Sequence, residues 1–125
     1  MVYNAQNKLA IIIVLFSFSI IRAQSLVCKE TYNWYFGHNA AITFNGSSSP
    51  TPSALSNSAM NMNEGCSSLS DEIGNLLFYS NGINVWDASH SIMPNGTGLA
   101  GTGSSGQSSI AVPMPQNDSW YYLFT

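Results

Sequence analysis

Two short apolar segments joined by an Asn-Gly pair constrain the fold of this chain more than any other feature. Residues 76–80 (LLFYS) and 83–87 (INVWD) flank Asn81 and Gly82. Asn-Gly between such segments predicts a β-hairpin, because a two-residue type I′ turn needs positive φ at both positions. The register that this turn predicts pairs Ser80 with Ile83, Tyr79 with Asn84, Phe78 with Val85 and Leu77 with Trp86.

Both faces of the predicted hairpin are apolar. Successive side chains alternate between the two faces of a strand. One face then carries Leu76, Phe78, Ile83 and Val85, and the other carries Leu77, Tyr79 and Trp86. A sheet with one solvated face would alternate apolar and polar residues. We therefore expect this hairpin to be covered on both sides, like a propeller blade between two neighbours or the centre of a β-sandwich.

The rest of the chain after the N-terminal leader also predicts strands, separated by turns and polar loops. We expect further strands over residues 32–37, 40–44, 66–70, 109–112 and 120–125, with turns over 71–75 and 113–118. The loop over 45–63 is rich in Ser, Asn and Pro, and could hold a brief helical turn over 54–62. The glycine-rich segment 94–109 is predicted as a flexible loop. The predicted fold is all-β, an antiparallel meander of partial propeller-like blades over residues 24–125, after a signal-peptide helix.

The N-terminus has the pattern of a secretory signal peptide. Lys8 precedes an apolar run over residues 9–21, and Arg22 and Ala23 follow it. The run is shorter than the ~20 apolar residues of a membrane-spanning helix and fits a signal-peptide core. The sequence predicts a leader over residues 1–23 and a secreted or cell-surface protein, with no stable membrane insertion after cleavage; an N-terminal membrane anchor is the alternative.

Charge excludes one class of partner. Lys29 is the single basic residue after the leader, against six Asp and Glu residues in the chain. Phosphate backbones are bound by clustered Lys and Arg, so we expect no nucleic-acid partner. An anionic membrane surface is excluded on the same ground.

Cys28 and Cys66 are the only cysteines. Export makes a disulfide between them chemically possible, and two separate thiols are the alternative. Their spacing does not resemble that of a structural zinc site, and we expect no metal and no cofactor.

The residues that could carry catalysis each have a simpler structural explanation. Gly96 to Gly106 contain two overlapping G-x-G-x-x-G matches, but no helix is predicted after them to bind a phosphate. His38 and His90 have no identifiable nucleophile and are interpreted as loop residues. Asp71, Glu72 and Asp87 could form a carboxylate pair for glycoside hydrolysis, but Asp71 opens a turn that Asp stabilises through its own backbone. We therefore predict no catalytic residue.

Aromatic side chains are the remaining candidates for binding. Aromatic residues in small β-domains are mostly core, but Trp34 and Trp120 could form a ligand-stacking platform for sugars. The partners expected on this basis are extracellular glycans or surface proteins.

A long ordered series of short motifs carries a family resemblance. It comprises Asn33-Trp34-Tyr35-Phe36-Gly37, Glu64-Gly65-Cys66, Ser70-Asp71 with Gly74-Asn75-Leu76-Leu77-Phe78-Tyr79, Gly82 with Val85-Trp86, His90, Met93-Pro94-Asn95-Gly96-Thr97-Gly98-Leu99, Gln107-Ser108, Val112-Pro113 and Tyr121-Tyr122-Leu123-Phe124-Thr125. The chain resembles the N-terminal region of large secreted Bacteroidota proteins with PKD repeats and a gliding-motility-associated (type B) sorting domain for type IX secretion.

The resemblance implies a propeller-like β-domain in a secreted or cell-surface protein, and it implies no reaction. The chain stops at Thr125 inside a predicted apolar strand, so we expect a fragment whose partners include downstream domains of the same polypeptide. The expected function is non-catalytic, in adhesion or another extracellular interaction. The alternative is the N-terminal part of a glycan-acting propeller enzyme or a carbohydrate-binding module.

Overall fold

Eight strands in three antiparallel sheets make up the described part of the chain. The computed structural model describes residues 28–45 and 51–125. Over these two ranges it contains no helix, and so none that is long and apolar enough to span a membrane. The predicted all-β antiparallel class is confirmed. The expected leader helix over residues 1–23 lies outside the described residues.

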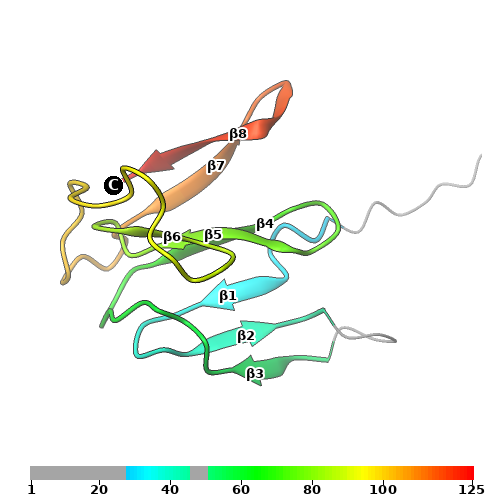
Figure 1. Ribbon diagram of the computed structural model, residues 1–125, viewed down its shortest axis with the longest axis horizontal. Coiled ribbons are helices and arrows are strands. Elements are labelled where there is room, and N and C mark those ends of the chain that lie inside the picture. Colours follow the sequence, from blue (N-terminus) through cyan, green and yellow to red (C-terminus); the bar gives the residue numbers. More distant parts are fainter. Residues whose placement is uncertain (1–27, 46–50) are drawn as a thin grey trace, which may run out of the picture.

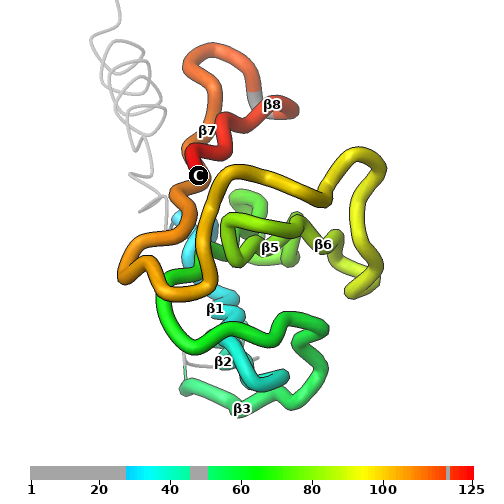
Figure 2. The backbone as a smooth tube through the Cα atoms, turned by 90° about the vertical axis from the view of Figure 1, so that its left-hand side faces the viewer, coloured from blue at the N-terminus to red at the C-terminus, as the bar shows by residue number. Residues whose placement is uncertain are grey.

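The three sheets follow one another in chain order (Figure 1). Sheet A consists of β1 (Asn33–Tyr35), β2 (Ala41–Thr43) and β3 (Ser53–Leu55). Sheet B consists of β4 (Ser67–Ser70), β5 (Leu76–Ser80) and β6 (Val85–Asp87). Sheet C consists of β7 (Ile110–Met114) and β8 (Asn117–Phe124). Figure 2 shows from a second side that sheet B lies between sheets A and C.

The first strands of the three sheets lie side by side, with β1 against β4 and β4 against β7. Small hydroxyl side chains bridge them. Ser68 Oγ donates to the carbonyl of Asn33 (2.8 Å) and accepts from the backbone N–H of Tyr35 (3.3 Å). On the other side of β4, the hydroxyls of Ser67 and Ser109 share a hydrogen bond of 2.8 Å. This succession of antiparallel sheets, each joined to the next through its first strand, is a propeller-like arrangement.

The register of the central hairpin is two residues from the predicted one. Ser80 pairs with Val85 and Tyr79 pairs with Trp86, so the predicted two-residue turn is wrong and the loop spans residues 81–84. The Asn81 side-chain oxygen accepts the backbone N–H groups of Ile83 (3.0 Å) and Asn84 (2.8 Å). These bonds hold Ile83 in the loop, where only Gly82 has positive φ (81°).

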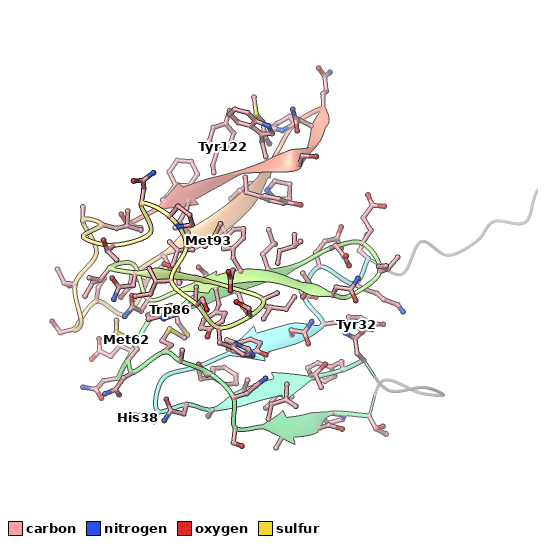
Figure 3. All side chains as sticks on the ribbon, in the orientation of Figure 1. Tyr32, His38, Met62, Trp86, Met93 and Tyr122 are labelled. Carbon is pink, nitrogen blue, oxygen red and sulfur yellow. The ribbon has the colours of Figure 1, made fainter. Side chains whose placement is uncertain are left out.

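The prediction that this hairpin is covered on both faces is confirmed. A shift of two residues leaves every paired side chain on its predicted face. On one face, the Tyr79 ring stacks on Tyr35 of sheet A with a centroid distance of 4.5 Å. On the other face, the Phe78 ring meets Tyr121 of sheet C edge-on at 5.7 Å. Figure 3 shows Trp86 among the side chains around sheet B.

Two other predictions are corrected by the structure. The helical turn predicted over residues 54–62 is absent, and Ser53–Leu55 instead form a strand that pairs with β2. The turn predicted over 113–118 is shorter, because β7 continues to Met114 and the turn is Pro115-Gln116. Gln116 has a positive φ of 64° and follows Pro115. Proline followed by a residue with positive φ is typical of a type II turn.

The glycine-rich segment is attached to sheet B rather than left flexible. No helix follows its glycine motifs. The backbone of Val85 donates to the carbonyl of Gly96 (2.8 Å), and the N–H of Leu99 donates to the carbonyl of Ile83 (3.0 Å). The segment therefore lies along the edge of β6 and of the loop before it.

Candidate functional site

The outer face of sheet C carries the largest group of exposed apolar side chains in the described ranges. We call it the C face and define it by Ile110, Val112, Trp120, Tyr122 and Phe124, which are 48, 40, 67, 47 and 61% exposed. The register Ile110↔Phe124 and Val112↔Tyr122 places them on one side of the sheet. Figure 3 shows Tyr122 on the side of β8 that faces away from sheet B.

The C face carries aromatic rings, as do the faces that are buried between sheets. Tyr35 against Tyr79 joins sheets A and B, and Phe78 against Tyr121 joins sheets B and C. On β8, the ring centroids of Tyr122 and Phe124 lie 6.1 Å apart, but no sheet of the described chain covers these rings. The C face is therefore suited to packing against another sheet.

The edge of β8 is open beside this face. In sheets A and B the second strand, β2 or β5, pairs with a strand on each side. Among the described strands, β8 pairs only with β7. An unpaired edge next to an exposed apolar face can accept a further strand.

The two tryptophans proposed as one platform lie on different sheets. Trp34 belongs to β1 in sheet A and Trp120 belongs to β8 in sheet C. Trp34 is 48% exposed, and its indole N–H donates to the carbonyl of Thr31 (2.7 Å). The structure therefore gives the two aromatic side chains separate surroundings.

Both cysteines are free thiols in the structure. Cys28 is exposed, whereas Cys66 is partly buried and its Sγ donates to the carbonyl of Tyr35 (3.2 Å). Burial raises the pKa of the Cys66 thiol, which keeps it protonated and unreactive near neutral pH. The disulfide between them remains a prediction.

His90 is a hydrogen-bonded loop residue, as expected from the sequence. Its Nδ1 lies 3.2 Å from the hydroxyl of Tyr79, and its Nε2 lies 2.9 Å from the side-chain nitrogen of Asn57. Both ring nitrogens are therefore engaged in holding the loop after β6 against the core. His38 is exposed in the turn between β1 and β2, with a positive φ of 58°.

The carboxylate of Asp71 stabilises its own turn, which confirms the structural explanation. It accepts the backbone N–H groups of Ile73 (3.0 Å) and Asn75 (2.8 Å) and the side-chain amide of Asn75 (2.8 Å). Partial desolvation raises the pKa of Asp71, but these hydrogen bonds outweigh it and the net pKa is lowered. Glu72 lies exposed in the same turn.

Asp87 is held in the same way at the end of β6. Its Oδ1 accepts the hydroxyl of Ser89 (2.6 Å) and the backbone N–H groups of Ser89 (2.8 Å) and Ser91 (3.1 Å). Hydrogen bonds from Ser89 and Ser91 hold the pKa of Asp87 below its ordinary value. No group of three or more His, Cys, Asp or Glu residues in the described ranges is placed to hold a metal ion.

We expect the two turn carboxylates to make the domain sensitive to acid. A carboxyl whose pKa is lower in the folded than in the unfolded chain stabilises the fold above its unfolded pKa of about 3.9. That contribution is lost as the pH falls through the folded pKa. The free energy of unfolding should therefore decline below about pH 4. The variant with Asp71→Asn and Asp87→Asn should decline less steeply in urea titrations at pH 7, 4 and 3. If the free energy of unfolding declined equally with falling pH in wild type and variant, this prediction would be contradicted.

The chain matches no family model, no curated protein and no solved structure.

Proposed function

We propose that this chain is a non-catalytic interaction segment of a secreted or cell-surface protein, acting in adhesion or another extracellular contact. The observation that supports it is the C face, with three exposed aromatic side chains beside the open edge of β8. Monomeric proteins rarely leave a contiguous apolar patch of this kind in water unless it binds something.

The partner that best fits the C face is another β-sheet. Its aromatic side chains resemble those that join sheets A, B and C, and a partner sheet would continue the same stack. We propose downstream domains of the same polypeptide as the first partner and extracellular surface proteins as the second. Secretion is proposed from the leader over residues 1–23.

The alternative enzyme function has less support from the described residues. Glycoside hydrolysis uses two carboxylates that reach the substrate, whereas Asp71 and Asp87 accept hydrogen bonds from their own turns. The alternative places the catalytic groups of a glycan-acting enzyme in a downstream part of the protein.

The C face can be tested with a triple variant, Trp120→Ser, Tyr122→Ser and Phe124→Ser. The chain is expressed with its leader and purified from the extracytoplasmic fraction. We expect wild type to bind the dye ANS, which reports exposed apolar surface, and to associate as its concentration rises in sedimentation velocity. The variant should lose most of both signals, because its outer strand face becomes polar.

Ile73→Ser is the matched control. Ile73 is 71% exposed but lies in the β4–β5 turn, beside Tyr121 and therefore on the side of sheet C opposite the C face, so the change should leave dye binding and association unaltered. An equal effect of Ile73→Ser, or a wild type that neither binds dye nor associates, would contradict the proposed interaction surface. Release of reducing ends from glycans by the wild type would overturn the non-catalytic assignment.

A further inference from the structure

A groove runs along the three neighbouring first strands, next to the C face, with which it shares Ile110. It has a volume of about 330 Å³ and is lined by residues of β1, β4 and β7 and of the segments that flank these strands. Trp34 and Ile110 contribute apolar lining from β1 and β7, and Ser67 and Ser68 of β4 lie between these strands. The volume falls within the range of small-ligand sites, ~300–1,000 Å³.

The indole of Trp34 is fixed in place although half of it is exposed. Its N–H donates to the carbonyl of Thr31 (2.7 Å). The rings of Phe36 and Phe44 meet it edge-on with centroid distances of 6.4 and 5.9 Å. Exposed side chains normally lose conformational entropy when a ligand orders them. A ring that is already held loses little, so Trp34 is a preorganised stacking surface.

The polar groups of the groove are uncharged. The described side chains that line it include the hydroxyls of Thr31 and Ser67 and the amide of Gln107, and no Asp, Glu, Lys or Arg. The hydroxyl of Ser109 is buried behind them, where it bonds Ser67 and the carbonyl of Ser80. The Gln107 amide nitrogen donates to the carbonyl of Ser109 (2.7 Å). The side-chain oxygen of Gln107 is then the acceptor that this residue offers to a ligand. Hydroxyl and amide groups both donate and accept, and so match the hydroxyls of a sugar.

We propose that this groove binds a neutral glycan, with one sugar ring stacked on Trp34 and its hydroxyls bonded to the hydroxyl and amide groups opposite. A rigid aromatic face next to uncharged donors and acceptors suits a ring that has an apolar face and polar edges. A charged ligand would find no counter-charge among these side chains. The assignment gives Trp34 and Trp120 different roles, a sugar for the first and a protein surface for the second.

The proposal is tested with the full chain, purified as above, and neutral hexasaccharides as probes. Maltohexaose, cellohexaose, xylohexaose and laminarihexaose are titrated by calorimetry and tryptophan fluorescence, with hexagalacturonic acid as the charged comparison. At least one neutral hexasaccharide should bind, and bind more tightly than the acidic one. Trp34→Ala should weaken it at least about tenfold, which corresponds to ~1.4 kcal/mol, and Trp34→Phe should weaken it less.

Two further variants locate the site and guard against loss of folding. Trp120→Ala removes an exposed tryptophan from the other surface and should leave the affinity unchanged. Gln107→Leu changes an exposed side chain of the groove and should weaken binding several-fold even if Trp34→Ala does not fold. The proposal is overturned if no neutral hexasaccharide binds the folded chain, if the acidic one binds more tightly, or if Trp120→Ala is the change that abolishes binding. None of these outcomes bears on dye binding or self-association at the C face.

Discussion

Replacing Tyr79 with alanine should lower the free energy of unfolding by about 3–5 kcal/mol, the range for removing a large buried aromatic side chain. Tyr79 is fully buried, and its ring lies between those of Tyr35 and Trp86, with centroid distances of 4.5 and 5.5 Å. Its hydroxyl accepts the backbone N–H of Ala59 (2.9 Å). The substitution therefore removes contacts between two sheets and leaves a cavity. The free energy of unfolding of native proteins is ~5–15 kcal/mol, so this loss is a large share of the total and should raise the fraction of unfolded molecules at 25 °C.

Two control variants separate the effect of the Tyr79 ring from that of its hydroxyl, and the effect of a buried tyrosine from that of an exposed one. Tyr79→Phe keeps the stacked ring but leaves the Ala59 N–H without its partner, and should cost about 1–3 kcal/mol. Tyr122→Ala removes the same side chain from the exposed C face and should cost much less. Urea unfolding followed by near-UV circular dichroism measures all three. A loss for Tyr79→Ala no larger than that for Tyr122→Ala would show that the stack does not hold sheets A and B together.

Gly37→Ala is the second change with a large expected effect, about 3 kcal/mol or more, because overpacking forces the backbone to move. A Cβ on Gly37 would overlap the carbonyl oxygen of Met62 and lie 2.5 Å from its carbonyl carbon and 2.8 Å from its nitrogen. These are backbone atoms, so no rotation of a side chain relieves the clash. Met62 is itself 6% exposed and belongs to the core. Sheet A would have to move away from the segment that leads into sheet B.

Gly103→Ala is the matched control for the glycine substitution. A Cβ at Gly103 has no atom within 4 Å, and its φ is not positive. It should be neutral or stabilise the fold by ~0.4–1 kcal/mol through the unfolded state. If the two variants unfold at the same urea concentration, the close approach of Gly37 to Met62 does not exist in solution.

The sequence predicted the faces of the central hairpin but not its register. Alternation has a period of two, so the apolar assignment of Phe78 and Tyr79 survives a shift of two residues. The register depended on the side chain of Asn81, whose oxygen binds Ile83 and Asn84. The Asn81 side chain thus competes with the backbone bonds of a two-residue turn, and the Asn-Gly pair alone does not show which of the two forms.

Strand β3 and part of the core were missed for a different reason. Ser53–Leu55 is short and lies among prolines and serines, so its pairing with β2 depends on a partner that local pattern does not reveal. Met60 and Met62 are buried although they follow no alternating pattern, because the segment after β3 passes over the core. The groove at Trp34 likewise combines three strands that are distant in the chain.

The serine bridges between first strands have a geometric consequence for how many such sheets can be joined. Ser67, Ser68 and Ser109 set the separation of neighbouring sheets along one edge. Farther from that edge, pairs of aromatic rings such as Phe78 and Tyr121 fill the space between the sheets. Small side chains on one side and large ones on the other give the gap between sheets B and C the form of a wedge. If further sheets were joined with the same spacing, such wedges would add up to a curve and bend the array towards a ring.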